Sequence, residues 1–106
     1  MNIAHWLRQE ITVAPMTGVN IHGEPQYGPQ RKIKARVEAS LRKVVNSDGQ
    51  EVLSDHQIFV LEPIGLQDRI WLPGTDPADV TQARRPLAVR GAVDKSGRTA
   101  FWVVDL

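Results

Sequence analysis

The stretch that decides the fold is KVVNSDGQEVLS, residues 43–54. Two valine-rich arms flank a turn built from Asn, Ser, Asp and Gly, and these residue types tolerate the backbone conformations that a tight turn requires. The pattern predicts a β-hairpin that turns at residues 46–49. Working outward from it, both arms extend into longer strands, so the centre of the chain is predicted to be one long antiparallel hairpin.

The arm before the turn alternates between apolar and polar residues. Every second position from Ile33 to Leu41 is apolar, and the positions between them are charged or polar. A period of two indicates a strand with one buried and one solvated face. The return arm, from Glu51 to about Leu61, becomes apolar on both sides near its end, which indicates burial between two layers.

The length of this hairpin has a consequence for its surroundings. Residues 31–46 span about 50 Å when extended, whereas a globule of about 100 residues is only about 30–35 Å across. Either the arms coil around the body or the tip, residues 42–53, protrudes. We expect protrusion, which leaves valines and Leu53 near the tip exposed and in need of a partner surface.

Shorter elements flank the hairpin. Strands are predicted at residues 7–14, 68–72, 87–93 and 99–106, separated by Pro and Gly turn signals. Asp76, Pro77 and Asp79 predict the start of a short helical turn. Residues 15–29, PMTGVNIHGEPQYGP, contain three glycines and three prolines. They are predicted to form a long loop without regular structure, either functional or simply exposed.

These elements predict an all-β fold. About six strands with almost no helix favour a small antiparallel β-barrel with one long protruding hairpin and a short helical turn. Closing the sheet would remove the unpaired edges that invite aggregation. The 106 residues fit a single domain, residues 1–106, with one modest core.

Composition excludes several classes of protein. The formal net charge is +1, so no overall field attracts the chain to nucleic acid or membranes. The absence of cysteine excludes a disulfide framework and thiol chemistry, and it fits a reducing cytosol. No apolar run has the length of a signal peptide or of a membrane span, so we expect neither.

No catalytic or metal-binding motif is visible. His5, His22 and His56 have no second ligand at metal spacing, and the pair of His22 with Glu24 fits a solvated loop. No nucleophile elbow, phosphate-binding loop or dinucleotide fingerprint occurs. We therefore expect a protein that is not an enzyme and that needs no metal or cofactor.

A basic run, RKIKAR at residues 31–36, raises the possibility of nucleic-acid contact. Its alternate cations, Lys32, Lys34 and Arg36, could follow phosphates. The same alternation also explains them as the solvated face of one strand. Stacking aromatics are sparse, and the tryptophans lie among apolar residues, as expected for core or interface: Trp6, Trp71 and Trp102.

Taken as a whole, the chain resembles the bacteriophage head closure proteins, also called stoppers or head-tail joining proteins. The matching segments are ITVAPMTGVNIHGEPQYGP, KIKARVEASLRKVVNSDGQEVLSDHQIFV, and DRIWLPG with the Asp-Pro segment after it. The resemblance runs from about residue 5 to residue 106. Its motifs belong to strands and turns rather than to a chemical signature.

The resemblance implies a structural virion protein of the phage neck, at the head-tail junction. Such proteins are small β-barrels that form a ring below the portal and adaptor proteins, retain packaged DNA and provide a docking surface for the tail. The implied partners are copies of the chain itself, portal and adaptor proteins, tail proteins and the DNA in the channel, without a membrane. The protein would be made in the cytoplasm of a bacterial host.

The resemblance also implies roles for individual residues. A loop or ribbon between the second and third strands of the family points into the channel; on this chain it corresponds to a channel-gating hairpin of Val45, Asn46, Ser47, Asp48, Gly49 and Gln50. Alternatively, this hairpin clamps a neighbouring subunit. The loop 15–29 would face the adaptor or the adjacent subunit through Thr17, Val19, Ile21 and Tyr27. Lys32, Lys34 and Arg36 would meet DNA phosphates if their face lines the channel.

Two other functions are compatible with the sequence. One is a free nucleic-acid-binding β-barrel of the oligonucleotide-binding type, whose affinity would fall steeply as salt rises. The other is a different neck or tail component, such as a tail terminator, which its place in the particle would reveal. Because ring contacts are heterologous, we expect the isolated subunit to be mostly monomeric, with the loop and the hairpin tip mobile.

Overall fold

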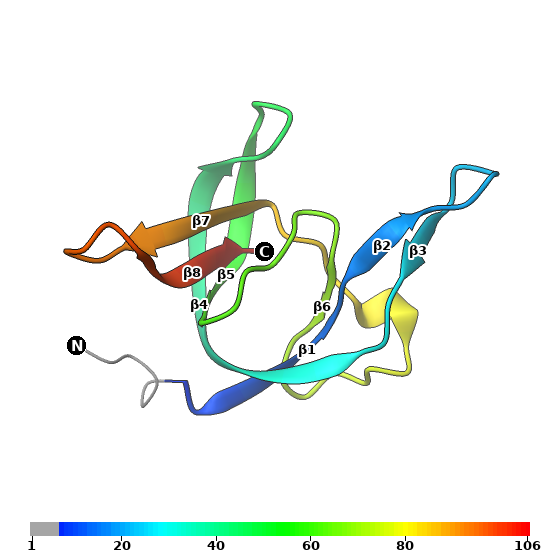
Figure 1. The fold of residues 1–106 in the computed structure, drawn as a ribbon, viewed down its shortest axis with the longest axis horizontal. Helices are drawn as coiled ribbons and strands as arrows, with labels where there is room; N and C mark the ends of the chain where they lie inside the picture. The colour runs from blue at the N-terminus through cyan, green and yellow to red at the C-terminus, as the bar shows by residue number, and fades with distance from the viewer. Residues whose placement is uncertain (1–6) are drawn as a thin grey trace.

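Six strands form one antiparallel sheet in this computed structural model, which describes residues 7–106 (Figure 1). The strand order is β6-β1-β4-β5-β8-β7, and β2 pairs only with β3 in a separate hairpin. The predicted all-β class is therefore confirmed. His5 and Trp6, which the sequence analysis considered, lie outside the described residues. The elements are β1 (Gln9–Ala14), β2 (Met16–Val19), β3 (Pro25–Tyr27), β4 (Arg31–Val45), β5 (Glu51–Val60), β6 (Arg69–Trp71), the 3-10 turn η2 (Val80–Gln82), β7 (Ala88–Val93) and β8 (Thr99–Asp105).

The central strand β4 has two partners along its length. Its first part pairs with β1 as far as Ala35, and from Ala35 to Val45 it pairs with β5. A bulge lies between Ala39 and Arg42, where β4 has one residue more than β5. Bulges bend a strand and increase its twist. β4 curves around the body at its start, and beyond the bulge it leaves the body (Figure 1).

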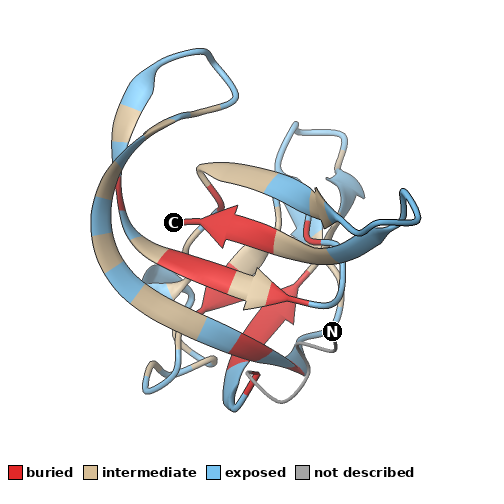
Figure 2. Cartoon of the chain, turned by 90° about the vertical axis from the view of Figure 1, so that its left-hand side faces the viewer, coloured by how far each residue is buried: buried red, intermediate tan, exposed pale blue. Residues whose placement is uncertain are grey.

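The outer part of the β4–β5 hairpin, residues 41–54, is here called the ribbon. Figures 1 and 2 show its tip extending away from the other strands, as expected. The molecule measures 45 Å along its longest axis and 30 and 28 Å along the others. Coiling and protrusion, posed as alternatives by the sequence, therefore both occur in the same hairpin.

The core lies on the inner face of the curved sheet (Figure 2). Ile33 and Ala35 are buried as the alternation predicts, and Trp71 is buried while Trp102 packs against the core. The alternation fails at Leu41, whose side chain is 78% exposed, because the bulge and the ribbon carry it out of the body. The buried cluster consists of Ile11, Val13, Ile33, Ala35, Ile58, Val60, Ile64, Ile70, Val104 and Leu106.

The ladders between the described strands do not close into a barrel. The sheet has two edges, β6 and β7. One backbone bridge joins β6 to the segment that precedes β7: Ile70 and Arg84 exchange two hydrogen bonds of 2.8 Å. Pro73 follows the short strand β6, and Pro86 lies between the bridge and β7. Because proline cannot donate to a ladder, it limits pairing along this seam.

Residues 15–29 are not a structureless loop, contrary to the prediction. They form the β2–β3 hairpin, whose turn uses Asn20: its Oδ1 accepts hydrogen bonds from His22 N (2.9 Å) and Glu24 N (3.0 Å). Gly23 supplies the positive φ, 78°, that closes the turn. Pro25 is tolerated because it is the first residue of its strand.

The same turn occurs in the three hairpins of the described residues, β2–β3, β4–β5 and β7–β8. In NIHGE, NSDGQ and DKSGR, at residues 20–24, 46–50 and 94–98, the first side chain accepts from the backbone N–H groups two and four residues later. The glycine at the fourth position has a φ of 78–85° in each. Asn and Asp side chains commonly stabilise a turn by accepting hydrogen bonds from the backbone N–H groups that follow them. The repeated pattern can be recognised in the sequence.

We predict that weakening the turn at Asn46 opens the ribbon locally. Asn46→Ala removes the acceptor for Asp48 N and Gln50 N, which lie 3.0 and 2.9 Å from Asn46 Oδ1. Hydrogen bonds of this kind contribute about 1 kcal/mol each, and two are lost, so ribbon amides should exchange with solvent up to roughly thirtyfold faster. Hydrogen exchange followed by NMR would measure this.

The control for this test is Asp48→Ala in the same turn. No hydrogen bond of the Asp48 side chain is seen among the described residues, so this variant should leave ribbon exchange unchanged. The core amide of Ile58 should be unaffected in both variants because local openings do not require global unfolding. Equal acceleration at Ile58 and in the ribbon would contradict the prediction.

The predicted helical start at Asp76 is displaced along the chain. The Asp76 carboxylate accepts from Ala78 N in a tight turn, and the 3-10 turn η2 begins at Val80, four residues after Asp76. Asp79, rather than Asp76, caps it by accepting from Thr81 N. A single 3-10 turn forms because only a few residues lie between Asp79 and Pro86.

Candidate functional site

The ribbon carries the residues predicted to gate a channel. Val45 is 59% exposed, and the turn residues that follow it lie at the tip (Figure 1). Lys43 lies opposite Leu53 and Val45 opposite Glu51, so these side chains share one face of the ribbon. Leu41, Val45 and Leu53 on this face are exposed by 78%, 59% and 67% and are called the ribbon patch.

A polar cluster fixes the base of the ribbon to the body. The Asp105 carboxylate, almost fully buried at the end of β8, accepts from Arg42 Nη2 at 2.7 Å and from Arg90 Nη1 at 3.2 Å. With its amide oxygen turned toward the two guanidinium groups, Gln57 accepts from Arg42 Nη2 (2.6 Å) and Arg90 Nη2 (3.0 Å). Arg42 directly follows the bulge, so this cluster lies where the ribbon leaves the sheet.

Sequence reasoning missed this cluster. Arg42 and Asp105 both lie in strands predicted from the sequence, and neither was given a role. The four residues come from β4, β5, β7 and β8, and only the registers of those strands bring them together. A charged residue between apolar neighbours near the end of VVDL was the one available signal.

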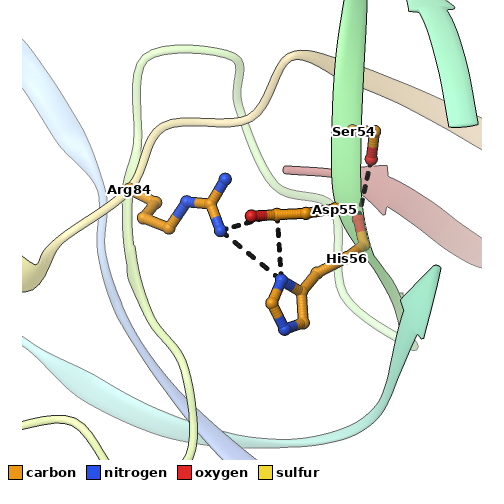
Figure 3. A network of polar contacts seen from close by, with 4 residues as sticks. All are labelled: Ser54, Asp55, His56 and Arg84. Atoms are coloured by element: carbon orange, nitrogen blue, oxygen red, sulfur yellow. Dashed lines mark hydrogen bonds and ion pairs between the residues drawn. The ribbon is translucent and has the colours of Figure 1, made fainter. Parts of the chain in front are cut away.

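A second cluster joins β5 to the segment before β7 (Figure 3). Asp55 Oδ1 accepts from His56 Nδ1 (2.9 Å) and from Arg84 Nη1 (2.8 Å). The hydrogen bond from His56, followed by the contact with Arg84, holds the pKa of the Asp55 carboxyl below its usual value. Arg84 also forms the backbone bridge with Ile70, so this cluster supports the seam between β6 and β7.

The run Ser54-Asp55-His56 is not a nucleophile arrangement. The Ser54 hydroxyl is buried and donates to the backbone carbonyl oxygen of His56 at 3.0 Å (Figure 3). A catalytic serine needs its hydroxyl within reach of the base that takes its proton. Here the Ser54 hydroxyl is hydrogen-bonded to the backbone, and the His56 imidazole contacts Asp55 instead of the hydroxyl. These contacts stabilise the strand and do not form a nucleophile–base pair.

The β2–β3 hairpin separates the residues predicted to form one interface. Val19 and Ile21 near its tip are 61% and 95% exposed and are called the hairpin patch. Thr17 donates to Gln26 O at 3.3 Å within the hairpin. Tyr27 lies at the base, where the Arg69 guanidinium lies 3.9 Å from its ring centroid.

The basic residues of β4 lie on the outer face of the sheet, opposite the core. Lys32, Lys34 and Arg36 alternate with the buried Ile33 and Ala35. Arg36 forms an ion pair of 2.9 Å with Glu38, while Lys34 lies across from Glu10 of β1. The structure brings together on this face residues that the sequence did not connect with the lysines, namely Phe59, Phe101 and Arg90.

Comparisons with known proteins give no family assignment. Searches of protein-family models and of curated proteins find no match to this sequence. Within residues 7–106, no group of three or more His, Cys, Asp or Glu side chains is placed to hold a metal ion. No helix in the same residues is long and apolar enough to cross a membrane.

Proposed function

We propose that this chain is a structural protein of the bacteriophage neck, of the head closure or stopper type. It assembles as a ring below the portal and adaptor, retains the packaged DNA and offers a docking surface to the tail. The observation that carries the proposal is the ribbon: a long arm that is fixed at its base and exposes apolar side chains toward its tip.

The geometry of the ribbon suits a gate. Asp105 and its two arginine partners hold the base, so the arm is not a free tether. A lone two-stranded ribbon is marginal in water, and this one exposes Leu41, Val45 and Leu53. Assembly into a ring would bring the tips of several subunits together and remove these side chains from water. The tip residues 45–50 would then obstruct the channel.

A second exposed arm supports assembly through unlike surfaces. The hairpin patch lies on β2–β3, apart from the ribbon patch on β4–β5 (Figure 1). Two different contact surfaces on one chain favour heterologous contacts, which generate rings when the rotation closes. The curved sheet, nearly closed by the bridge at Arg84, would be the barrel-like body from which both arms extend.

The test is to replace residues 45–52 by a two-residue turn in the phage that carries the gene. Heads should fill, because the body of the subunit is unchanged, but packaged DNA should leak from them when assembly is complete. Nuclease protection of packaged DNA and electron microscopy of the particles would measure this. Antibody-gold label on the unaltered particles should lie at the head-tail junction.

The matched control shortens the other arm. Replacing residues 19–25 by a two-residue turn should impair subunit or adaptor contact, so the protein should be missing from particles rather than present and leaky. Tight, tail-competent particles from the ribbon variant would remove the gating role. Absence of label from the junction, with an accessible epitope, would remove the neck assignment itself.

A further inference from the structure

We propose that the outer face of the sheet binds single-stranded nucleic acid across strands β4, β5, β8 and β7. The registers place four side chains in one row across these strands: Arg36, Phe59, Val103 and Arg90. Directly paired residues point to the same face of a sheet. The row therefore has an arginine at each end, and its centre consists of the half-buried Phe59 and of Val103, which is only 4% exposed, so Phe59 is the accessible apolar residue of the row. The backbones at its two ends lie about 14 Å apart, at three strand spacings.

The centre of the row is an aromatic platform. Phe59 and Phe101 are both half-buried, and their ring centroids lie 6.1 Å apart with the planes tilted by 51°. Phe101 lies on the same side of β8 as Val103 and is paired with the small residue Ala92. Bases stack on such side chains without sequence preference, because every base has a π-face.

Cations continue the row along β4. Lys34 and Lys32 follow Arg36 at every second residue, about 7 Å apart, on the same face. Neither lysine forms an ion pair within the described residues. Phosphates lying along this edge of the platform would meet the two ammonium groups, while Arg90 would contact the backbone at the opposite edge.

Carboxylates on the same face limit the affinity. Glu38 pairs with Arg36, Asp105 with Arg90, and Glu10 lies across from Lys34. The ion pairs orient the two arginines, but they also keep the excess of positive charge small. A small excess of positive charge predicts weak binding, and contacts to phosphates make that binding depend steeply on salt. The phenylalanines favour a flexible single strand over a duplex, because only the bases of a single strand can reach them.

The test uses the full chain and a fluorescent oligothymidylate of about 20 nucleotides, with binding followed by anisotropy. Four phosphate contacts give a slope of log K against log salt of about −3, so affinity should fall roughly fiftyfold between about 50 and 200 mM salt. The double variant Lys32→Gln/Lys34→Gln should halve that slope. The control Lys95→Gln, which makes the same kind of charge change in the β7–β8 turn, should leave the slope intact.

The platform is tested separately with Phe59→Leu. Leucine keeps apolar packing but removes the π-face, so affinity should fall at least about fivefold at every salt concentration with an unchanged slope. Thermal unfolding would verify that the variant is folded. No binding at about 50 mM salt, a slope insensitive to Lys32 and Lys34, or equal loss in Lys95→Gln would each overturn the proposal. Steep salt dependence is also the behaviour expected of the alternative function, a free nucleic-acid-binding barrel, so the neck assignment is tested separately, by the position of the antibody-gold label in particles.

Discussion

Replacing Asp105 by alanine should lower the free energy of unfolding by about 3 kcal/mol. The carboxylate is 1% exposed and joins Arg42 and Arg90, so its removal leaves two guanidinium groups around a buried space. Removing one partner of a buried ion pair typically costs about 3–5 kcal/mol. We expect the lower end, because the arginine side chains are 37% and 56% exposed and can regain water.

Urea unfolding measured by circular dichroism checks this prediction. Asp48→Ala is the matched control, since it deletes a carboxylate that is exposed in the ribbon turn, and it should change stability by less than about 0.5 kcal/mol. A double-mutant cycle of Asp105→Ala with Arg42→Ala should return a coupling energy of about 1–3 kcal/mol. Additive effects of the two substitutions, or a loss below about 1 kcal/mol for Asp105→Ala, would show that the cluster does not hold the ribbon.

Replacing Trp71 by alanine should cost about 3–5 kcal/mol. The side chain is 2% exposed, and large aromatic residues in a core cost this much when they are truncated. Its indole Nε1 also donates to Asp79 O at 3.0 Å. Truncation therefore releases the segment that runs from β6 through η2, in addition to leaving a cavity beside the core.

The variant Trp71→Phe separates these two effects. It keeps most of the ring but loses the hydrogen bond to Asp79, so the amides of η2 should exchange faster while the loss of stability stays well below that of alanine. Urea unfolding and hydrogen exchange measure the two quantities. If Trp71→Ala lowered the free energy of unfolding by less than about 1.5 kcal/mol, Trp71 would not contribute to core stability as predicted.

Local chemistry made much of the fold predictable. The alternation through Ile33 and Ala35 located β4, and the Asn46-Gly49 pattern located the turn, because both depend on residues close in the chain. The β2–β3 hairpin was missed although Asn20 and Gly23 repeat that pattern, since the surrounding prolines were given more weight. The failure at Leu41 has a different origin, because a bulge changes which face a side chain occupies.

Long-range geometry limited the rest of the prediction. Whether β6 and β7 pair depends on how strongly the sheet curves, and the pattern of residues along the chain does not encode this curvature. The cluster at Asp105 and the row through Phe59 both depend on registers between strands distant in sequence. The lysines of β4 could be found from the sequence alone, whereas their aromatic neighbours could not.

The shared turn of the three hairpins has a consequence for how this chain can change its dimensions. Each turn is closed by its own five residues and needs nothing from the body, so an arm can grow or shrink without redesign of its tip. Residues must be added in pairs on each strand, because a single insertion turns every later side chain to the opposite face. The length of each arm can thus change while the body stays the same. In the proposed ring, a channel of different width could be matched by changing only the number of residue pairs in the arms.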